Sequence, residues 1–571
     1  MAFVKRYVFI ASLLLILLST GILCACAISN YEGGTTPARN FNDPRGYLQS
    51  EGNRPYDVTE QTTGERSRVS GSPNRAPEGQ APDAGAVRRE RNRQAETENR
   101  VAGQAREPGP DQPGAPSGGS RPGATASAGT RYAPQLLACA AVFLILSVAA
   151  YRLLARNKLK IEPDREKALM LTLLGAGLLL RVAASTLMEG HTDIYLFKSW
   201  ASSVASNFSQ FYSGFRPSDY PPLYIYVLYL IGKVAAIPAV NPYYTLLLKL
   251  PSIAADIASS YLIYRLARKR LAPETGVLLS AFYVFNPAVF INSTFWGQVD
   301  SFFTLIVIAA VCLLSEKKTG LSAFLFAAAV LMKPQGIIFL PVLFFELVRQ
   351  KSFKTMLKAA TIALSAAAVI VLPFSYSKGV LWIFSLFSKT AAEYPYASVN
   401  AFNFFGLIGK NYVRDGNVPF LFSYHTWGII FIVLVALFAW FIYVKGKSSL
   451  FASAAALLLI AGVFTFSTRM HERYLFPAVA LSILAFIYLK DKRLLLLSAG
   501  FSAAVYINTH YVLFKTSSGI NSAPYSPVLI FTSLLTVVLF VCLVKVLYDI
   551  AVKKRTYTCR CLNTGELPWL E

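Results

Sequence analysis

A long series of apolar segments fills the chain from about residue 133 onward, and it restricts the fold more than any other feature. Helices are expected near 133–155, 167–187, 244–267, 275–297, 300–315, 320–334, 335–349, 357–374, 427–445, 449–466, 473–490, 494–513 and 526–548. Apolar helices of about 20 residues can cross a bilayer because they satisfy their backbone hydrogen bonds internally. The sequence therefore predicts an all-α polytopic membrane protein, in agreement with 54% apolar and 15% charged residues.

The net charge of +24 is carried almost entirely by this membrane part of the chain. Residues 28–131 hold 14 Arg and 13 acidic residues, so the rest of the chain carries a net charge of +23. A basic excess within a membrane-embedded body points to membrane topology and anionic lipid, and not to nucleic acid. The seven cysteines form no paired framework, which excludes a disulfide-stabilised secreted protein.

The chain divides into four parts. Residues 1–27, apolar after a short cationic start, are expected to be a signal anchor or a signal peptide. An uncleaved anchor is favoured, although Leu-Cys-Ala-Cys loosely resembles a lipoprotein cleavage box that would place a lipid on Cys26. Residues 28–131 hold 11 Pro, 15 Gly and no Lys, which predicts a disordered extracytoplasmic tether. The transmembrane domain is expected over 132–548, with a cytoplasmic tail at 549–571.

The distribution of Lys and Arg predicts which breaks between the apolar segments face the cytoplasm. Placing RNKLKIEPDREK, RLARKR, EKK, RQKSFKTMLK, KGK, KDKR and KKRTYTCR inside puts 24 Lys and Arg there, against 11 on the opposite side. The alternation holds only if the apolar segment 222–239 does not cross the membrane. We therefore expect an interfacial or re-entrant helix there, within a long outer loop at 188–243, and a second large outer loop at 375–426.

Ionisable and amide side chains gather at the outer junctions. A carboxylate at the membrane surface, such as Asp193, stays ionised through contact with water and still meets lipid-borne substrates. The alternative is an ordinary interfacial loop acid. The sequence Thr468-Arg-Met-His-Glu-Arg-Tyr474 suits a phosphate, because guanidinium groups offer matched donors at fixed charge, although Arg473 alone is also explained by snorkelling.

Three further ionisable residues lie within the apolar segments. Lys249 and Asp256 are seven residues apart on one expected helix and share a face, and Arg181 interrupts another apolar run. Such residues face the interior of a helical bundle, where they have either a functional role or a structural pairing. For Lys249 and Asp256, the alternative to a functional role is a pairing with each other. Transporters concentrate polar groups near the midplane and show internal repeats, so polar groups crowded at one face favour a reaction at the membrane surface.

Seven stretches, taken in order, resemble the GT-C superfamily of polytopic glycosyltransferases, which use polyprenyl-phosphate-linked sugars as donors. They are HTDIYLFKSWA, DYPPLYIY, KLPSIAAD, FNPAVFINSTFWGQVDS, KPQG, YPYASVNAFNFFGLIG and TRMHERYLFPA, within about residues 165–515. The sequence is similar to bacterial mannosyltransferase-like proteins and, more distantly, to dolichyl-phosphate-glucose-dependent glucosyltransferases. The resemblance implies a GT-C-like transmembrane bundle whose long first extracytoplasmic loop carries interfacial helices.

The resemblance also implies roles for residues of this sequence. The family's catalytic base, an Asp of the first outer loop, falls on Asp193. The candidates for binding the donor phosphate are Lys333, Arg469, His471 and Arg473. The candidates for contacting sugar or acceptor are His191, Asp219, Tyr220, Gln298, Asp300, Gln335, Asn400 and Asn403. Members of the superfamily differ in their need for metal, so a divalent cation stays open as a cofactor, with Asp300 as its candidate ligand.

The expected function is inverting transfer of a hexose, with mannose favoured, from a polyprenyl-phosphate-linked donor to an extracytoplasmic glycan, lipid or protein. The expected location is the bacterial plasma membrane, with the active site on its extracytoplasmic face, membrane lipids as partners and no role for nucleic acid. This interpretation requires the His-Asp loop, the Trp-Gly-Gln turn and the Arg-rich corner to meet. The alternatives are a lipid-linked-sugar flippase or other polytopic transporter, and a non-catalytic scaffold whose tether recruits partners.

Overall fold

The computed structural model describes residues 2–31, 33, 131–156, 160–214, 218–376, 378–379, 381–516 and 522–557. They belong to one compact unit, and the other unit of the chain, residues 38–121, lies outside the described ranges. The predicted tether, apart from its two ends, is therefore outside them, and so is the tail beyond residue 557.

Helices joined by short turns and loops make up the described residues, which contain isolated β-bridges but no strand. Nine helical stretches among the described residues are long and apolar enough to cross a membrane. The predicted all-α polytopic membrane protein is confirmed. The α-helices are α1 (Ala2–Ser29), α4 (Ala133–Ala155), α5 (Pro163–Ser185), α6 (Asp193–Ser206), α7 (Pro222–Ala235), α8 (Tyr244–Arg268), α9 (Pro273–Val284), α10 (Pro287–Ile291), α11 (Asp300–Ser315), α12 (Thr319–Met332), α13 (Leu340–Gln350), α14 (Phe353–Val371), α15 (Trp382–Ala392), α16 (Phe404–Leu407), α17 (Tyr424–Gly446), α18 (Ala452–Phe466), α19 (Pro477–Leu489), α20 (Lys492–Thr516) and α21 (Pro527–Ala551).

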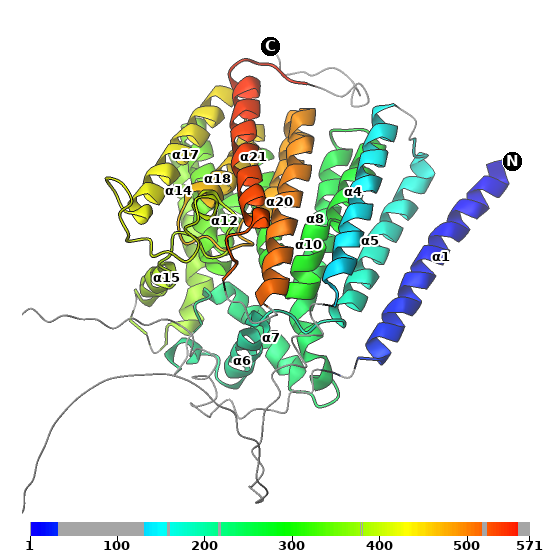
Figure 1. Cartoon of the computed structure of the whole chain (residues 1–571), viewed down its shortest axis with the longest axis horizontal. Helices are drawn as coiled ribbons and strands as arrows, with labels where there is room; N and C mark the ends of the chain where they lie inside the picture. The colour runs from blue at the N-terminus through cyan, green and yellow to red at the C-terminus, as the bar shows by residue number, and fades with distance from the viewer. Residues whose placement is uncertain are drawn as a thin grey trace, which may run out of the picture. The chain divides into compact units, whose positions relative to one another are not determined.

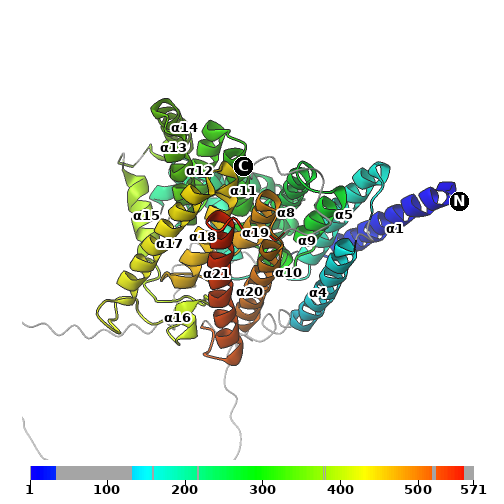
Figure 2. The same cartoon turned by 90° about the horizontal axis from the view of Figure 1, so that it is seen from above.

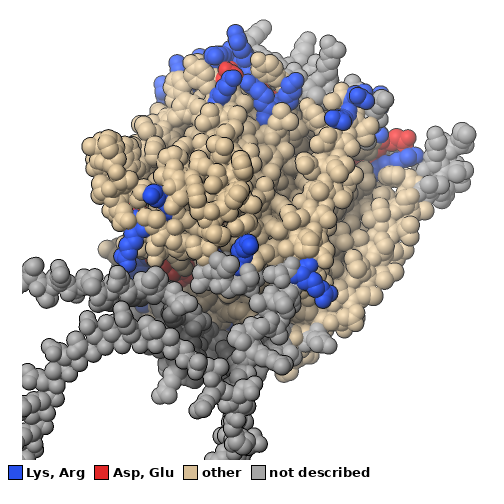
Figure 3. All heavy atoms as spheres, in the orientation of Figure 1, with Lys and Arg blue, Asp and Glu red and all other residues tan. Residues whose placement is uncertain are grey.

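The turns predicted to face the cytoplasm lie together at one end of the helical bundle. Lys269 Nζ, after α8, lies 3.0 Å from Glu316 Oε1, after α11, and Arg493 Nη1 of α20 lies 2.8 Å from Asp549 Oδ2 of α21. In the face drawn in Figure 3, Lys and Arg side chains concentrate at this end, where the last helix also ends (Figure 1). We call it the basic end and the opposite end the site end. The described turns alternate between the two ends as the sequence predicted.

The long first loop lies at the site end and carries two interfacial helices, α6 and α7 (Figure 1). Helix α7 has 14 residues, fewer than a straight membrane span needs. It packs against α6 at Gly232, where an added Cβ atom would lie 2.2 Å from the carbonyl oxygen of Ala201. The segment expected at 222–239 thus forms a shorter helix that does not add a crossing to the alternation.

Helices α18 and α19 form the centre of the bundle. Every residue of α19 is buried, and α18 is buried from Ala452 to Thr465. The small residues of α18 allow the close approach of helices that stabilises bundles in lipid. Helix α1 lies at the periphery, beside α5 (Figure 2), where Leu17 contacts Gly175 and where Tyr31, just after α1, stacks on Tyr243.

One expected helix, 275–297, is interrupted at its middle. Helix α9 ends at Val284 and α10 begins at Pro287, because proline lacks the N–H that would continue the helical hydrogen bonds. Asn286 caps α10 by accepting a hydrogen bond from the Ala288 N–H at 2.9 Å. A π-helical turn, η3 (Asn292–Trp296), follows directly and leads into the site end.

Lys249 and Asp256 do not pair with each other, which was the structural alternative that the sequence left open beside a functional role. Asp256 Oδ2 lies 3.0 Å from Arg181 Nε, and both side chains are fully buried. Lys249 donates hydrogen bonds to the carbonyl oxygens of Ser185 and Met188, at the end of α5. Lys249 and Asp256 are both buried in the bundle, but a second helix, α5, supplies the partner of Asp256, which the spacing along α8 could not reveal.

Candidate active site

The long first loop at the site end, predicted to be an outer loop, places Asp193 at the start of a helix. Gly190 has a φ of +134°, and a Cβ atom there would lie 2.9 Å from the carbonyl oxygen of Trp296. The next residue, His191, donates its backbone N–H to that same oxygen at 3.1 Å. Glycine is therefore required for the chain to turn against Trp296, and α6 begins at once with Asp193. A carboxylate in the first turn of a helix is stabilised by the helix dipole.

The junction between α10 and α11 brings a second group of polar residues to the same place. The π-helical turn η3 ends at Trp296 and is followed by Gly297, whose φ of +78° is readily adopted only by glycine. Gln298 follows, and its side-chain Nε2 donates a hydrogen bond to Asp193 Oδ2. Asp300 then begins α11. Single π-turns of this kind often occur at functional sites, and this one contributes Asn292 and Trp296 as well.

Asp300 lies in a buried polar cluster beside Asp193. Its Oδ1 accepts a hydrogen bond from Lys333 Nζ at 2.5 Å, and its Oδ2 accepts one from Asn292 Nδ2 at 3.1 Å. The side chains of Asp300 and Lys333 are only 2% and 5% exposed. Lys333 precedes Pro334, which ends α12 and begins the 3₁₀ turn η4 (Pro334–Phe339).

Arg473 connects these two junctions with the Arg-rich corner between α18 and α19. Its Nη2 lies 3.3 Å from Asp193 Oδ2, its Nε lies 3.6 Å from Asp300 Oδ2, and its Nη1 lies 2.5 Å from Glu472 Oε1. The guanidinium also lies over the Trp296 ring, 5.4 Å from the centroid, and His191 stacks on that ring at 4.7 Å. The His-Asp loop, the Trp-Gly-Gln turn and the Arg-rich corner therefore meet at the site end.

The protonation states follow from this environment. Burial raises the pKa of Asp193, but the charge of Arg473 and the hydrogen bond with His191 outweigh it, so that the pKa lies well below its usual range. Asp193 is therefore ionised at neutral pH. Its side chain is 26% exposed, and contact with water also favours the ionised form. Burial, together with the charge of Arg473, lowers the pKa of His471 to about 3. The sequence made His471 a candidate for binding the donor phosphate, whereas its half-buried imidazole is neutral at neutral pH.

Arg469 takes a position separate from Arg473. Its Nε lies 2.6 Å from Asp415 Oδ2, in the second outer loop, and its Nη1 donates to the carbonyl oxygen of Ala391 at 2.6 Å. The His471 ring lies edge-on to Tyr394 at 4.8 Å. Of the four predicted phosphate-binding residues, Lys333 and Arg473 share the Asp300 carboxylate, and Arg469 is bound to the second outer loop.

The two predicted asparagines hold this second outer loop in place. Asn400 Oδ1 accepts hydrogen bonds from the Ala523 N–H at 2.8 Å and from Asn411 Nδ2 at 3.1 Å. Asn403 is fully buried. Its Oδ1 caps α16, and its Nδ2 donates to the carbonyl oxygen of Phe464 at 3.1 Å. Because both amides are used internally, we do not include Asn400 and Asn403 in the proposed sugar site.

The remaining predicted residues border the Lys333 cluster. Tyr220 lies beside Lys333, whose Nζ is 5.9 Å from the centre of the tyrosine ring. Burial raises the pKa of the neighbouring Asp219, and the negative charge of Asp193 contributes in the same direction. Gln335, two residues after Lys333, has a buried Nε2 without a hydrogen-bond partner among the described residues. Tyr220 and Asp219 thus lie near the charged cluster, and Gln335 follows Lys333 by two residues.

The surroundings of Asp300 do not fit the predicted metal-ligand role. Its two oxygens already accept hydrogen bonds from Lys333 and Asn292, and the Arg473 guanidinium lies next to one of them. A divalent cation would have to displace two fixed positive charges from a single carboxylate. The described residues contain no group of three or more acidic, His or Cys side chains arranged to hold a metal ion.

Four residues near the site received no role of their own from the sequence, although Trp296 begins the Trp-Gly-Gln turn that the interpretation required: Asn292, Trp296, Glu472 and Asp415. Asn292 and Trp296 lie in a segment expected to be a continuous helix, and only the π-turn brings them toward Asp300. Glu472 was noted as part of the Arg-rich corner but was given no role, although its ion pair with Arg473 follows from adjacency. Nothing in the sequence connects Asp415 with Arg469.

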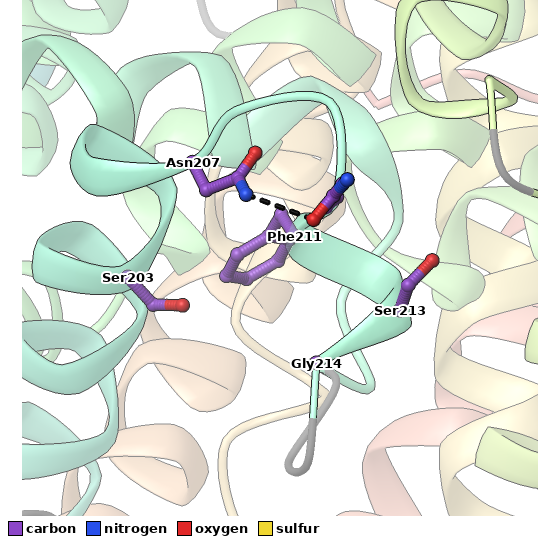
Figure 4. A pocket seen from close by; sticks show the side chains of 6 residues that line it. Ser203, Asn207, Phe211, Ser213 and Gly214 are labelled. Carbon is purple, nitrogen blue, oxygen red and sulfur yellow. Dashed lines mark hydrogen bonds between the residues drawn. The ribbon is translucent and has the colours of Figure 1, made fainter.

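A shallow polar pocket lies elsewhere in the first outer loop, between the end of α6 and the 3₁₀ turn η1 (Phe211–Ser213), as Figure 4 shows. Its volume is about 180 Å³, and Asn207 Nδ2 donates to Gln210 Oε1 at 2.9 Å on its wall. Ser203, also on the wall, follows Asp193 by ten residues on α6, which corresponds to about 15 Å along the helix. This pocket is not part of the Asp193 cluster.

Comparison with known families identifies the class of protein. Residues 219–468 match the model of glycosyltransferase family 87, which belongs to the GT-C type membrane glycosyltransferases. No curated protein matches the chain. The match covers Asp300 and Lys333, whereas Asp193 and Arg473 lie outside it. The fold and this match support a polytopic membrane glycosyltransferase, and the predicted resemblance to the GT-C type is confirmed over residues 219–468. Its matched region is, more narrowly, a glycosyltransferase family 87 domain.

Proposed function

We propose that the protein transfers one hexose, most simply mannose, from a polyprenyl-phosphate-linked donor to an acceptor hydroxyl outside the cytoplasm, with inversion at the anomeric carbon. The observation that carries this proposal is the ionised Asp193 held by Gln298 and Arg473 at the site end. A transferase of this kind needs a base for the acceptor and cations for the donor phosphate close together. The preference for mannose comes from the resemblance to bacterial mannosyltransferase-like proteins.

Asp193 is the proposed general base. Its carboxylate takes the proton from the acceptor hydroxyl while the acceptor oxygen attacks the anomeric carbon. The bond between that carbon and the phosphate oxygen breaks, and the polyprenyl phosphate leaves with the electron pair. Gln298 supports this role because its hydrogen bond fixes the orientation of the carboxylate. With 26% of its side chain exposed, Asp193 is accessible to an acceptor.

Arg473 and Lys333 are the proposed partners of the donor phosphate. The leaving phosphate gains negative charge as the sugar departs, so cations fixed in advance stabilise the transition state more than the ground state. Their low exposure, 13% for Arg473 and 5% for Lys333, strengthens these interactions because little water competes. Asp219, Tyr220, Gln335 and His191 are proposed to contact the sugar or the acceptor.

The location of the site supports a lipid-linked donor. The carboxylates lie where membrane-spanning helices end, so that a polyprenyl chain can stay in the bilayer while its phosphate reaches Arg473. The concentration of Lys and Arg at the opposite end favours that end as cytoplasmic, which puts the proposed site on the extracytoplasmic face. In a bacterium, this would be the outer face of the plasma membrane.

Reconstitution of the purified protein in vesicles tests the proposal. The vesicles receive polyprenyl-phosphate-linked mannose or glucose carrying a labelled sugar, together with an extract of envelope acceptors. We expect a new glycosidic bond to the labelled hexose. It should form at the same rate in sealed vesicles and in vesicles that have been made leaky. Movement of the labelled lipid across the bilayer without any new bond would instead support a flippase. Mass spectrometry of glycans from cells lacking the protein would identify the acceptor by a missing hexose.

A further inference from the structure

The counter-ions of the two aspartates at the site differ in a way that bears on the reaction. Asp300 has Lys333 at 2.5 Å and a hydrogen bond from Asn292. Among the described residues, Arg473 is the only Lys or Arg within ion-pair distance of Asp193. The proposed base thus depends for its neutralisation on a single guanidinium, while Asp300 keeps a cation of its own if that guanidinium moves.

The ion pair with Arg473 makes Asp193 a weaker base. A carboxylate paired with a cation holds a proton weakly, because protonation removes the favourable charge interaction. Removal of Arg473 from Asp193 would increase the proton affinity of the carboxylate. The charged and titratable groups that face Asp193 from the surrounding segments are His191, Asp219, Tyr220, Asp300, Lys333, Tyr394, His471, Glu472 and Arg473.

A second observation concerns hydrogen bonds that the site leaves unused. The contacts of Arg473 with Asp193 and Asp300, at 3.3 and 3.6 Å, are longer than its 2.5 Å contact with Glu472. Arg473 Nε is buried and has no hydrogen-bond partner among the described residues. The indole Nε1 of Trp296, on whose ring the guanidinium lies, is a second such buried donor. Both donors lack a hydrogen bond, although Arg473 Nε lies 3.6 Å from Asp300 Oδ2, and donors of this kind suit an anionic oxygen acceptor.

Building on the proposed function, we propose that Arg473 is an exchangeable counter-ion. It neutralises Asp193 in the donor-free enzyme and turns to the donor phosphate when that phosphate binds, with the Trp296 indole N–H as a second donor. Asp193 then becomes a competent base only after the donor has arrived. The glutamate next to it in sequence, Glu472, keeps the guanidinium in place in both states.

The exchange fits the charge changes of the reaction. The bound donor is a phosphodiester with one negative charge, which takes over the interaction that Asp193 gives up. In the transfer step, the acceptor O–H bond breaks and its proton moves to Asp193, while the polyprenyl phosphate leaves with a second negative charge beside Arg473. The carboxylate thus loses its charge as the phosphate gains one, and the guanidinium stays with the group that carries the charge.

Binding measurements test the exchange without turnover. Farnesyl phosphate, a short polyprenyl phosphate, is titrated into the full-length purified protein in detergent, and farnesol serves as the probe without phosphate. Asp193→Asn frees Arg473 from its competitor, so we expect this variant to bind farnesyl phosphate about tenfold more tightly than the unmodified protein, equivalent to about 1.4 kcal/mol. Arg473→Gln should weaken binding, and farnesol should bind all variants equally.

A double-mutant cycle separates the exchange from simple charge repulsion. If the gain acts through Arg473, Asp193→Asn should tighten binding at least about threefold less in the Arg473→Gln background. An equal gain in both backgrounds, or no gain in Asp193→Asn, would overturn the proposal. Glu316→Gln, which removes an acid at the basic end, should leave binding unchanged, and elution profiles report whether each variant folds.

The proposed function has its own readout. If Asp193→Asn transfers hexose at the unmodified rate, the proposed function fails, whatever the binding data show. If the variant is inactive but binds farnesyl phosphate no more tightly, the exchange alone fails and the proposed base remains.

Discussion

The buried pair of Lys333 and Asp300 allows a quantitative prediction for stability. We consider Lys333→Met, which keeps most of the apolar stem of the side chain and removes its charge. Asp300 is 2% exposed and would lose its shortest interaction, the 2.5 Å contact with Lys333 Nζ. It would retain the hydrogen bond from Asn292 and the Arg473 contact at 3.6 Å.

The expected cost follows from these contacts. Breaking a buried ion pair by removing one partner costs about 3–5 kcal/mol, because the other charge stays buried without compensation. Since Asp300 keeps two partners, we expect Lys333→Met to lower the free energy of unfolding by about 3 kcal/mol. The double variant Lys333→Met, Asp300→Asn removes both charges and should cost about 2 kcal/mol less than the sum of the two single variants.

Denaturant titration of the purified protein in detergent, followed by tryptophan fluorescence, measures these free energies. Lys269→Met is the matched control, because Lys269 pairs with Glu316 at the exposed basic end, with 58% of its side chain accessible. Its cost should be within about 1 kcal/mol of zero. The reasoning would be refuted if Lys333→Met cost no more than Lys269→Met, or if the two single effects at the site simply added in the double variant.

Further predictions concern the first loop and the histidine beside the site. Gly232→Ala should destabilise the protein by about 1–3 kcal/mol in the same titration, because its Cβ would lie 2.2 Å from the Ala201 carbonyl oxygen, whereas Gly416→Ala, with open space around it, should change stability by about 0.5 kcal/mol or less. His471, whose pKa falls from 6.5 to about 3 on folding, contributes stability that is complete above pH 6.5 and is lost as the pH falls toward 3. We therefore expect His471→Gln to flatten the decline of melting temperature between pH 6.5 and 4, and an unchanged slope would show that the imidazole is not buried in its neutral form.

The sequence predicted the topology and the meeting of the outer junctions because both follow from one physical rule. Basic turns alternating with apolar segments indicate which helix ends share a membrane face. The same rule assigns Asp193, Gln298 and Arg473 to one face, and each of them lies close to a helix end at that face. The non-spanning segment 222–239 followed from the same alternation, and it is this segment that forms α7.

The choice of partners at the site could not be predicted in this way. Arg469 and Arg473 are four residues apart, yet Arg469 pairs with Asp415 and Arg473 with Asp193. Arg469 has a left-handed backbone conformation, with a φ of +63°, so the two side chains point in different directions. The neutral state of His471 depends on burial by residues distant in sequence. The amide side chain of Asn403 made it a candidate for contacting a sugar. Only the fold reveals that this amide caps the first turn of α16.

The central claim, that Asp193 is the base of a transferase, is tested most directly by single-turnover kinetics. Purified protein loaded with labelled polyprenyl-phosphate mannose is mixed with the acceptor, and the first-order rate of bond formation is compared between the unmodified protein and Asp193→Asn. A lost general base should slow this rate by about 10²- to 10⁴-fold while the donor stays bound. A rate within about threefold of the unmodified protein would contradict the account.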